Sequence, residues 1–207
     1  SVRVEPLPLL VYCHDGPWSR DLPGYDRGAQ ALATMGFAVL QVNYRGSAGF
    51  GRAYLTALRD LGEKAALDDL VATLDWVQGR EAVSRKRVAI LGNGYGGYLA
   101  VRAMQVFPDR FRCAVSINAP TDLPRWLQDP DTAYSFNAGV REAFFGRNWA
   151  ALKAASPSLN GQPVQGPVLI VQAANDQLVP EQQGRELRRA LAAGPVQPEY
   201  LEVPGEG

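Results

Sequence analysis

A glycine-rich turn is the stretch of this 207-residue sequence best suited to present a reactive group. The apolar run at residues 88–91 stops at the turn, residues 92–97, and a helix-like pattern follows it. A strand–turn–helix unit of this build lifts the residue at its apex clear of the sheet, and in a G-x-S-x-G elbow that residue is a nucleophilic serine. The apex residue here is Gly94, which has no side chain with which to attack.

Two other positions carry residue types that serve nucleophilic catalysis. Asp176 follows an apolar run at residues 168–171, where an aspartate could orient a catalytic base. The alternative for Asp176 is a turn or a helix cap before Glu181, a role that aspartate often fills. His14, the only histidine, follows the apolar run at residues 8–13. A lone histidine at a strand end is more often structural, so we expect His14 to shape its loop.

The same turn also matches G-x-G-x-x-G, the fingerprint of a dinucleotide-binding loop. That fingerprint belongs to the first strand–helix unit of its domain and requires an acidic residue about 20 positions further on. Here the turn lies in the third unit, and the next strand ends at Asn118 and Ala119. The surroundings therefore disfavour the dinucleotide interpretation, and we expect no cofactor and no metal.

Apolar runs and helical spacing alternate along the chain, which predicts an α/β fold with a mostly parallel sheet and helices on both faces. Residues 43–51 are expected to form a polar, glycine-rich loop, and residues 118–156 a capping segment of short helices. The expected strands are 8–13, 37–42, 88–91, 113–117, 168–171 and 200–203, and the expected helices are 25–35, 64–77, 95–106 and 181–193. Loops that follow parallel strands gather at one edge of the sheet, which is the predicted site.

Five spaced motifs occur in order along the chain: HDGPW, NYRGSAGFGRAY, GNGYGGY, AASP and NDQLVP. Together they resemble the catalytic domain of the prolyl oligopeptidase family of serine peptidases, most closely the acylaminoacyl-peptidase type. The resemblance covers nearly the whole chain and implies an α/β-hydrolase fold. It also implies peptide substrates, or small esters or amides, and a β-propeller domain that precedes this one in the parent protein.

The resemblance assigns roles to individual positions. The family's nucleophilic serine falls on Gly94, and its triad aspartate matches Asp176. His14 and Asp15 fall in the family's H-G-G-P loop, whose backbone helps to form the oxyanion hole, and the N–H of Tyr95 is the other expected donor. Asp15 replaces a family glycine, which reduces the freedom of that loop.

The family's catalytic histidine follows a segment like PGEG and is expected beyond Gly207, so we expect a C-terminally incomplete fold with open sheet surface near residues 200–203. Ser47, Ser116 and Ser156 lack an elbow and offer no substitute nucleophile. The sequence is therefore consistent with a disabled peptidase, with a pseudo-peptidase that binds peptides as a scaffold, and with an introduced glycine.

Other residues are candidates for the edge of the site. Arg45 either anchors a neighbouring loop through its planar guanidinium group or is a solvated cation. The predicted capping segment contains four large aromatic residues that either line a substrate pocket or only cover the end of the sheet: Trp126, Phe136, Phe144 and Trp149.

Composition narrows the class of protein. About 46% apolar residues can bury one substantial core, so we expect a single domain over residues 1–207. Acidic and basic residues balance at 21 each, so bulk charge favours neither nucleic acid nor a membrane surface as a partner. No apolar run is long enough to span a bilayer. Cys13 and Cys113 are expected to be buried thiols, which favours a reducing compartment such as the cytoplasm.

Overall fold

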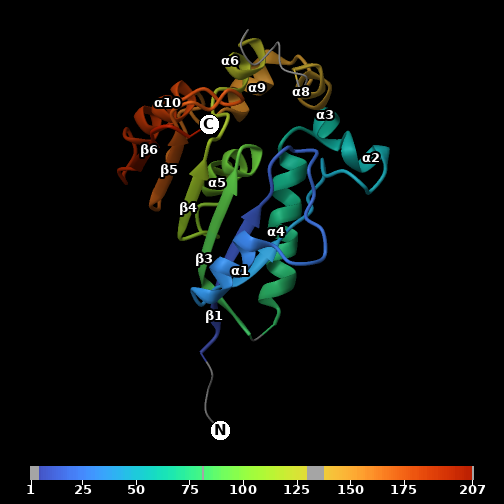
Figure 1. The fold of residues 1–207 in the computed structure, drawn as a ribbon, viewed down its shortest axis with the longest axis vertical. Helices are drawn as coiled ribbons and strands as arrows, with labels where there is room; N and C mark the ends of the chain where they lie inside the picture. Colours follow the sequence, from blue (N-terminus) through green and yellow to red (C-terminus); the bar gives the residue numbers. More distant parts are fainter. Residues whose placement is uncertain (1–4, 81, 130–137, 207) are drawn as a thin grey trace.

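A computed structural model describes residues 5–80, 82–129 and 138–206. Its centre is a six-stranded sheet in the order β2-β1-β3-β4-β5-β6, and every neighbouring pair is parallel (Figure 1). All of the expected strands are present, which confirms the α/β prediction. The strands are β1 (Leu7–Cys13), β2 (Ala38–Gln41), β3 (Val83–Asn93), β4 (Cys113–Ile117), β5 (Val168–Ala173) and β6 (Glu199–Val203).

Four helices in the connections between these strands pack on the sheet: α1 (Arg27–Thr34), α4 (Lys64–Gln78), α5 (Tyr95–Val106) and α10 (Gln182–Leu191). Crossovers between parallel strands are right-handed. From β1 to β2 the chain moves one way across the sheet, and from β3 to β4 it moves the other way. As a result α1 covers one face, and α4, α5 and α10 cover the opposite face.

The core lies between the sheet and α5. Tyr98, Leu99 and Val101 of this helix are fully buried, as are Val11 and Ile90 of the strands beneath it. Burial of one such apolar side chain contributes about 1.5–3 kcal/mol. This burial holds rigid the helix that begins at the glycine turn.

Several short helices lie beyond the carboxyl ends of the strands, at the top of Figure 1: α2 (Arg52–Leu55), α3 (Ala57–Leu61), α6 (Leu123–Gln128), α8 (Ala138–Phe145) and α9 (Trp149–Ala155). The sequence indicated short helices for the region of α6, α8 and α9 but none for α2 and α3. Strand β3 begins at Val83, well before the apolar run at residues 88–91. The sequence did not predict this first half of the strand, because it is partly exposed and polar.

β6 is an edge strand of the sheet, and Leu201 within it is 53% exposed.

Cys13 is buried and Cys113 is half-buried, and neither forms a disulfide. Burial raises the pKa of both thiols. Over the described ranges, no helix combines the length and the apolar character that a membrane span requires.

Candidate functional site

The chain turns sharply at Gly94, between the last residue of β3, Asn93, and the first of α5, Tyr95. Gly94 has φ 54° and ψ −122°. L side chains rarely adopt this conformation, and a nucleophile elbow holds its serine in a strained turn of this kind. The Gly94 N–H donates a 2.9 Å hydrogen bond to the carbonyl oxygen of Ile117, which ties the turn to the end of β4. The strand–elbow–helix unit is therefore present, and its apex carries no side chain.

The glycines around the apex allow close packing. A Cβ on Gly96 would lie 2.2 Å from the carbonyl oxygen of Cys13, and a Cβ on Gly92 would lie 2.2 Å from the backbone of Gly96. Residues 92 and 96 must therefore be glycine for α5 to contact β1 and β3. Gly97, the last glycine of the G-x-G-x-x-G pattern, is also closely packed, because a Cβ there would lie 2.8 Å from the carbonyl oxygen of Ile117. Packing therefore accounts for Gly92 and Gly97 of the pattern without a pyrophosphate ligand.

The elbow lies at the topological switch point of the sheet, where the connections leaving two adjacent strands run in opposite directions. β1 and β3 are adjacent, and the connections that leave them run to opposite sides of the sheet. Ligands of open α/β sheets bind at such a point, beyond the carboxyl ends of the strands. The loop after β1, which contains His14 and Asp15, therefore faces the turn at Gly94.

The side chain of Asp15 lies directly over the elbow. Its Oδ1 accepts hydrogen bonds from the backbone N–H of Gly16, at 2.6 Å, and from that of Tyr95, at 2.8 Å. Two convergent N–H groups, one of them at a helix N-terminus, form the arrangement that stabilises an anionic oxygen. Tyr95 was expected to be one of these donors, but the carboxylate that fills the position was not foreseen.

The Asp15 carboxylate also occupies the space of a side chain at position 94. A Cβ built on Gly94 would lie 2.0 Å from Asp15 Oδ1 and 2.4 Å from its Cγ. Real Cβ atoms do not approach other heavy atoms so closely, so this position of Asp15 requires glycine at the apex. The sequence signal for this arrangement was an aspartate at a glycine position of the family loop.

His14 is held by contacts on both ring nitrogens. Its Nδ1 donates to the carbonyl oxygen of Asp15 at 2.7 Å, and its Nε2 lies 2.8 Å from Ser47 Oγ. The ring stacks on Tyr44 with the centroids 4.3 Å apart, and Tyr44 Oη donates to the His14 carbonyl oxygen at 2.6 Å. Burial lowers the pKa of the imidazole. These contacts fix the loop that carries Asp15, in keeping with the loop-shaping role expected for His14.

Asp176 stabilises the turn after β5. Its Oδ1 accepts from the N–H groups of Leu178, at 2.8 Å, and Val179, at 2.9 Å. The helix that follows has Glu181 at its N-cap, without a side-chain hydrogen bond to the helix. Asp176 lines an open surface pocket with Pro180 and Glu181, whereas Leu178 and Val179 face the elbow. The loop of Asp176 thus reaches the elbow, while its carboxylate binds its own turn.

A cavity of about 120 Å³ lies over the elbow, and we call it the elbow cavity. Its wall includes Asp15, Gly94, Tyr95, Trp126 and Val179. Trp126 Nε1 donates to the carbonyl oxygen of Leu178 at 2.7 Å and so connects α6 to the turn of Asp176. Trp126 therefore lines a pocket, one of the two roles considered for the aromatic residues.

Of the other aromatic candidates, Trp149 and Phe144 do not line the elbow cavity. Trp149 is 44% exposed, and Phe144 is buried with its ring centroid 5.1 Å from that of Trp18. Phe136 lies outside the described residues.

Arg45 anchors its loop, because its Nε donates to Asp69 at 3.0 Å and its Nη2 donates to the carbonyl oxygen of Ala65 at 3.1 Å.

A second cavity, of about 310 Å³, has Tyr95 in its wall, as the elbow cavity does, and we call it the rear cavity. Glu63, Tyr98, Leu123 and Phe145 contribute to its wall together with Tyr95. Among the described residues the buried Tyr95 hydroxyl has no hydrogen-bond partner. The rear cavity was not predicted, since its wall combines residues from helices far apart in the chain.

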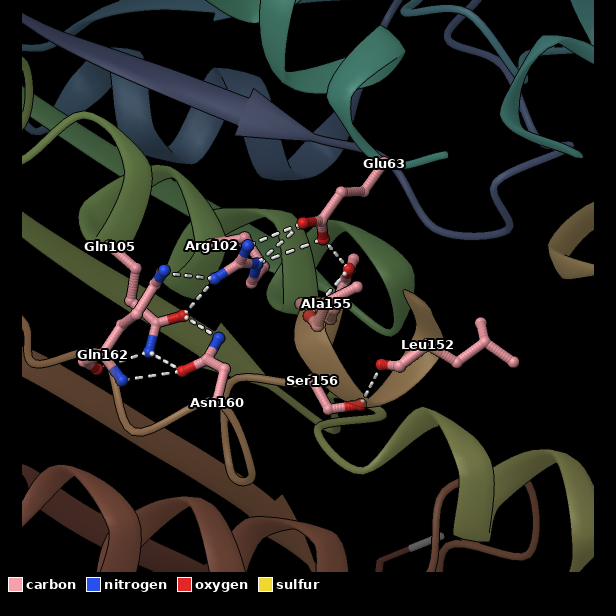
Figure 2. A network of polar contacts seen from close by, with 9 residues as sticks. Glu63, Arg102, Gln105, Leu152, Ala155, Ser156, Asn160 and Gln162 are labelled. Carbon is pink, nitrogen blue, oxygen red and sulfur yellow. Dashed lines mark hydrogen bonds and ion pairs between the residues drawn. The ribbon is translucent and has the colours of Figure 1, made fainter. Parts of the chain in front are cut away.

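A partly buried polar network that includes Glu63 borders the rear cavity (Figure 2). Arg102 of α5 donates to the Glu63 carboxylate from Nε and Nη2, and its Nη1 donates to Gln105 at 2.7 Å and to Gln162 at 3.0 Å. The Tyr98 hydroxyl also donates to Glu63. This network connects the helix of the elbow to the chain before α4 and after α9.

The three serines considered as substitute nucleophiles are all fully buried. Ser47 Oγ donates to the carbonyl oxygen of Tyr44, and Ser156 Oγ donates to that of Leu152, each at 2.7 Å. Ser116 lies within β4, and its hydroxyl has no partner among the described residues. None of the three lines the elbow cavity.

The strand order, the elbow after the third strand and the paired N–H groups above it define an α/β-hydrolase. A puromycin-hydrolysing peptidase of Mycobacterium tuberculosis has the same architecture, with a TM-score of 0.89 and 28% identity over 100% of this chain and 31% of that one. An acylaminoacyl peptidase of Pyrococcus horikoshii, 21% identical with a TM-score of 0.85, shares the fold over 99% of this chain and 34% of its own.

Within that class the chain belongs to the prolyl oligopeptidase family, whose sequence pattern matches residues 23–207. It is 34% identical to dipeptidyl aminopeptidase BIII of Pseudoxanthomonas mexicana over 98% of this chain. It is 30% identical to the acylamino-acid-releasing enzyme of Sus scrofa over 90% of this chain. The chain spans only 30% and 26% of the length of these two relatives.

Proposed function

We propose that this chain is a peptidase-type domain that binds peptides at the elbow cavity and does not form an acyl-enzyme. One observation carries the proposal: the apex of the elbow is Gly94, the position at which a G-x-S-x-G elbow carries its serine nucleophile. A Ser-His-Asp site acts as a unit, so loss of the serine removes the covalent route. The buried serines at 47, 116 and 156 cannot replace it.

Retention of the pocket supports peptide binding. The wall of the elbow cavity combines the aromatic side chains of Trp18, Tyr95 and Trp126 with the polar residues Asp15 and Ser19. Aromatic side chains beside a few placed polar groups are typical of ligand sites. The names of the relatives, a dipeptidyl aminopeptidase and an acylamino-acid-releasing enzyme, describe enzymes that act on peptides or amino-acid derivatives. Peptides, or small esters or amides, are accordingly the proposed ligand class.

In this proposal the loop of Asp176 and the loop of His14 and Asp15 keep the positions of a peptidase site and form the walls of a binding cleft. The parent protein is proposed to contain a β-propeller before this domain, in line with the length of the relatives. The unpaired thiols of Cys13 and Cys113 support a reducing compartment such as the cytoplasm.

A fluorophosphonate probe tests the missing nucleophile, because it labels only an activated serine. We expect no labelling of the full-length protein under conditions in which an active serine hydrolase is labelled completely. Stoichiometric labelling that maps to this domain would show that a nucleophile exists and would end the proposal.

Calorimetry with short N-acetylated peptides tests the retained pocket. Binding without turnover is the expected result, and Trp126→Ala should weaken it at least fivefold because the indole forms part of the cavity wall. Trp76→Ala is the matched control, since Trp76 is 62% exposed on α4. Equal effects of the two substitutions, or no binding to the unmodified protein, would contradict the proposed cleft.

A further inference from the structure

We propose that the Asp15 carboxylate is an internal ligand of the oxyanion position, the space facing the N–H groups of Gly16 and Tyr95. The elbow is thereby closed to external anions by the chain itself. This block is separate from the missing nucleophile, because it acts on the groups that would stabilise negative charge and involves no covalent step.

The hydrogen bonds identify an anion site with an occupant. Both N–H groups donate to a single oxygen, Asp15 Oδ1, at 2.6 and 2.8 Å. Tyr95 is 80 residues from Asp15 in the sequence, so this contact is tertiary and extends beyond a local turn. Tyr95 is also the first residue of the twelve-residue helix α5, whose N-terminal dipole favours a negative charge.

An external carboxylate would need the same two donors. The donors point at one oxygen, and a second anion beside Asp15 would be repelled by its charge. Asp15 is an exposed residue, so its side chain can leave the position when a competitor is strong enough or when the residue is replaced. The site that Asp15 fills therefore suits a carboxylate, such as the C-terminus of a cleaved peptide.

The occupant also depends on the residue at position 94. Because a Cβ there would lie 2.0 Å from Asp15 Oδ1, the internal carboxylate and any side chain at 94 exclude each other. Asp15 and Gly94 are thus a matched pair: the glycine creates the space, and the aspartate fills it.

Binding of two probes that differ only in charge tests the proposal: N-acetylphenylalanine, a carboxylate, and N-acetylphenylalanine amide. Both are titrated by calorimetry and amide NMR into the unmodified protein, Asp15→Gly and Asp15→Asn. The Asn variant is the matched control, because its Oδ1 can still accept from both N–H groups while the charge is gone.

We expect Asp15→Gly to bind the carboxylate at least tenfold more tightly than the unmodified protein, about 1.4 kcal/mol. Affinity for the amide should change less than threefold, and the amide resonances of Gly16 and Tyr95 should shift only with the carboxylate. Asp15→Asn should resemble the unmodified protein, because the position is still filled.

Three results would overturn the proposal. One is an unchanged carboxylate affinity in an Asp15→Gly protein whose amide spectrum shows that it is folded. Another is an equal gain for the amide, which would indicate a wider cavity without an anion site. The last is an Asp15→Asn protein that binds as Asp15→Gly does, which would indicate charge repulsion without occupancy. Fluorophosphonate labelling of the unmodified protein would contradict the proposed function but would not change the outcome of these binding experiments. The two proposals can therefore fail independently of each other.

Discussion

Arg102 and Glu63 form a buried ion pair, with 2.6 Å between Arg102 Nη2 and Glu63 Oε1, that connects the elbow helix to the residue before α4. The two side chains are only 6% and 15% exposed. Glu63 also faces the rear cavity, while Arg102 extends the network to Gln105 and Gln162 (Figure 2). The pair therefore connects α5 to the segment before α4 and restricts the orientation of the helix.

Replacement of one partner of this pair should destabilise the fold strongly. Arg102→Met leaves the Glu63 carboxylate buried without its cation, which typically costs about 3–5 kcal/mol. The double variant Glu63→Met/Arg102→Met should recover most of that loss, because no uncompensated charge remains. Urea unfolding measures the three free energies. A single variant within about 1 kcal/mol of the unmodified protein would show that the pair is solvated and not structural.

Gly94→Ala should destabilise the fold for two separable reasons. The conformation at φ 54° and ψ −122° costs an L residue about 1–3 kcal/mol, and the new Cβ displaces the Asp15 carboxylate from its two donors. Gly161→Ala is the control for a positive φ alone, since Gly161 has φ 67° and open space around its Cβ position. Thermal unfolding should show a larger loss for Gly94→Ala. An equal loss of thermal stability in the two variants would mean that the Asp15 carboxylate moves aside without a free-energy penalty.

Restoration of serine at position 94 alone should not be sufficient to restore a fully reactive nucleophile. The serine Cβ would compete with the Asp15 carboxylate, and the N–H groups that must stabilise the oxyanion would be free only when Asp15 swings away. In the full-length protein, we therefore expect Gly94→Ser/Asp15→Gly to react with a fluorophosphonate at least tenfold faster than Gly94→Ser. Equal rates in the two proteins would show that Asp15 does not obstruct the restored site.

The sequence predicted the framework of this site well but not its contacts. The strands were found because buried parallel strands are continuously apolar, and α5 was placed correctly because a glycine turn marks its start. Asp15 was identified as a departure from the family loop. Its contact with Tyr95 could not be found, because a hydrogen bond between residues 80 positions apart depends on strand order. The partnership of Glu63 and Arg102, 39 positions apart, was hidden for the same reason.

Arg45→Lys should loosen the loop at residues 43–51. Arg45 contacts the Asp69 carboxylate and the Ala65 carbonyl oxygen with its planar guanidinium group, and a lysine ammonium cannot reproduce that geometry. Since both side chains are about a quarter to a third exposed, the expected loss of stability is only about 1 kcal/mol. Hydrogen exchange should report faster exchange of the Arg45 amide, which donates to Asp69 at 2.7 Å. Unchanged exchange would identify the pair as incidental.

The titration of His14 should reveal how firmly its loop is held. Burial disfavours the imidazolium ion and lowers the pKa of His14 from its ordinary value near 6.5, although the Asp15 carbonyl oxygen, Asp21 and Asp15 oppose this effect. As the pH falls below about 6.5, the unfolded chain binds a proton that the native chain does not, so the free energy of unfolding should decrease. Above that pH both states are neutral and this contribution is constant.

The imidazole proton resonance of His14, the one histidine in these 207 residues, is assigned in a pH titration by NMR from its loss in His14→Gln. We expect a midpoint below 6.5 in the native protein. Ser47→Ala should move the midpoint, since it removes the contact at 2.8 Å to Nε2, while Ser158→Ala, whose hydroxyl donates to the Thr121 carbonyl oxygen, should not. A native midpoint at or above 6.5 would mean that the Asp15 carbonyl oxygen and the nearby carboxylates outweigh burial in setting the pKa of His14.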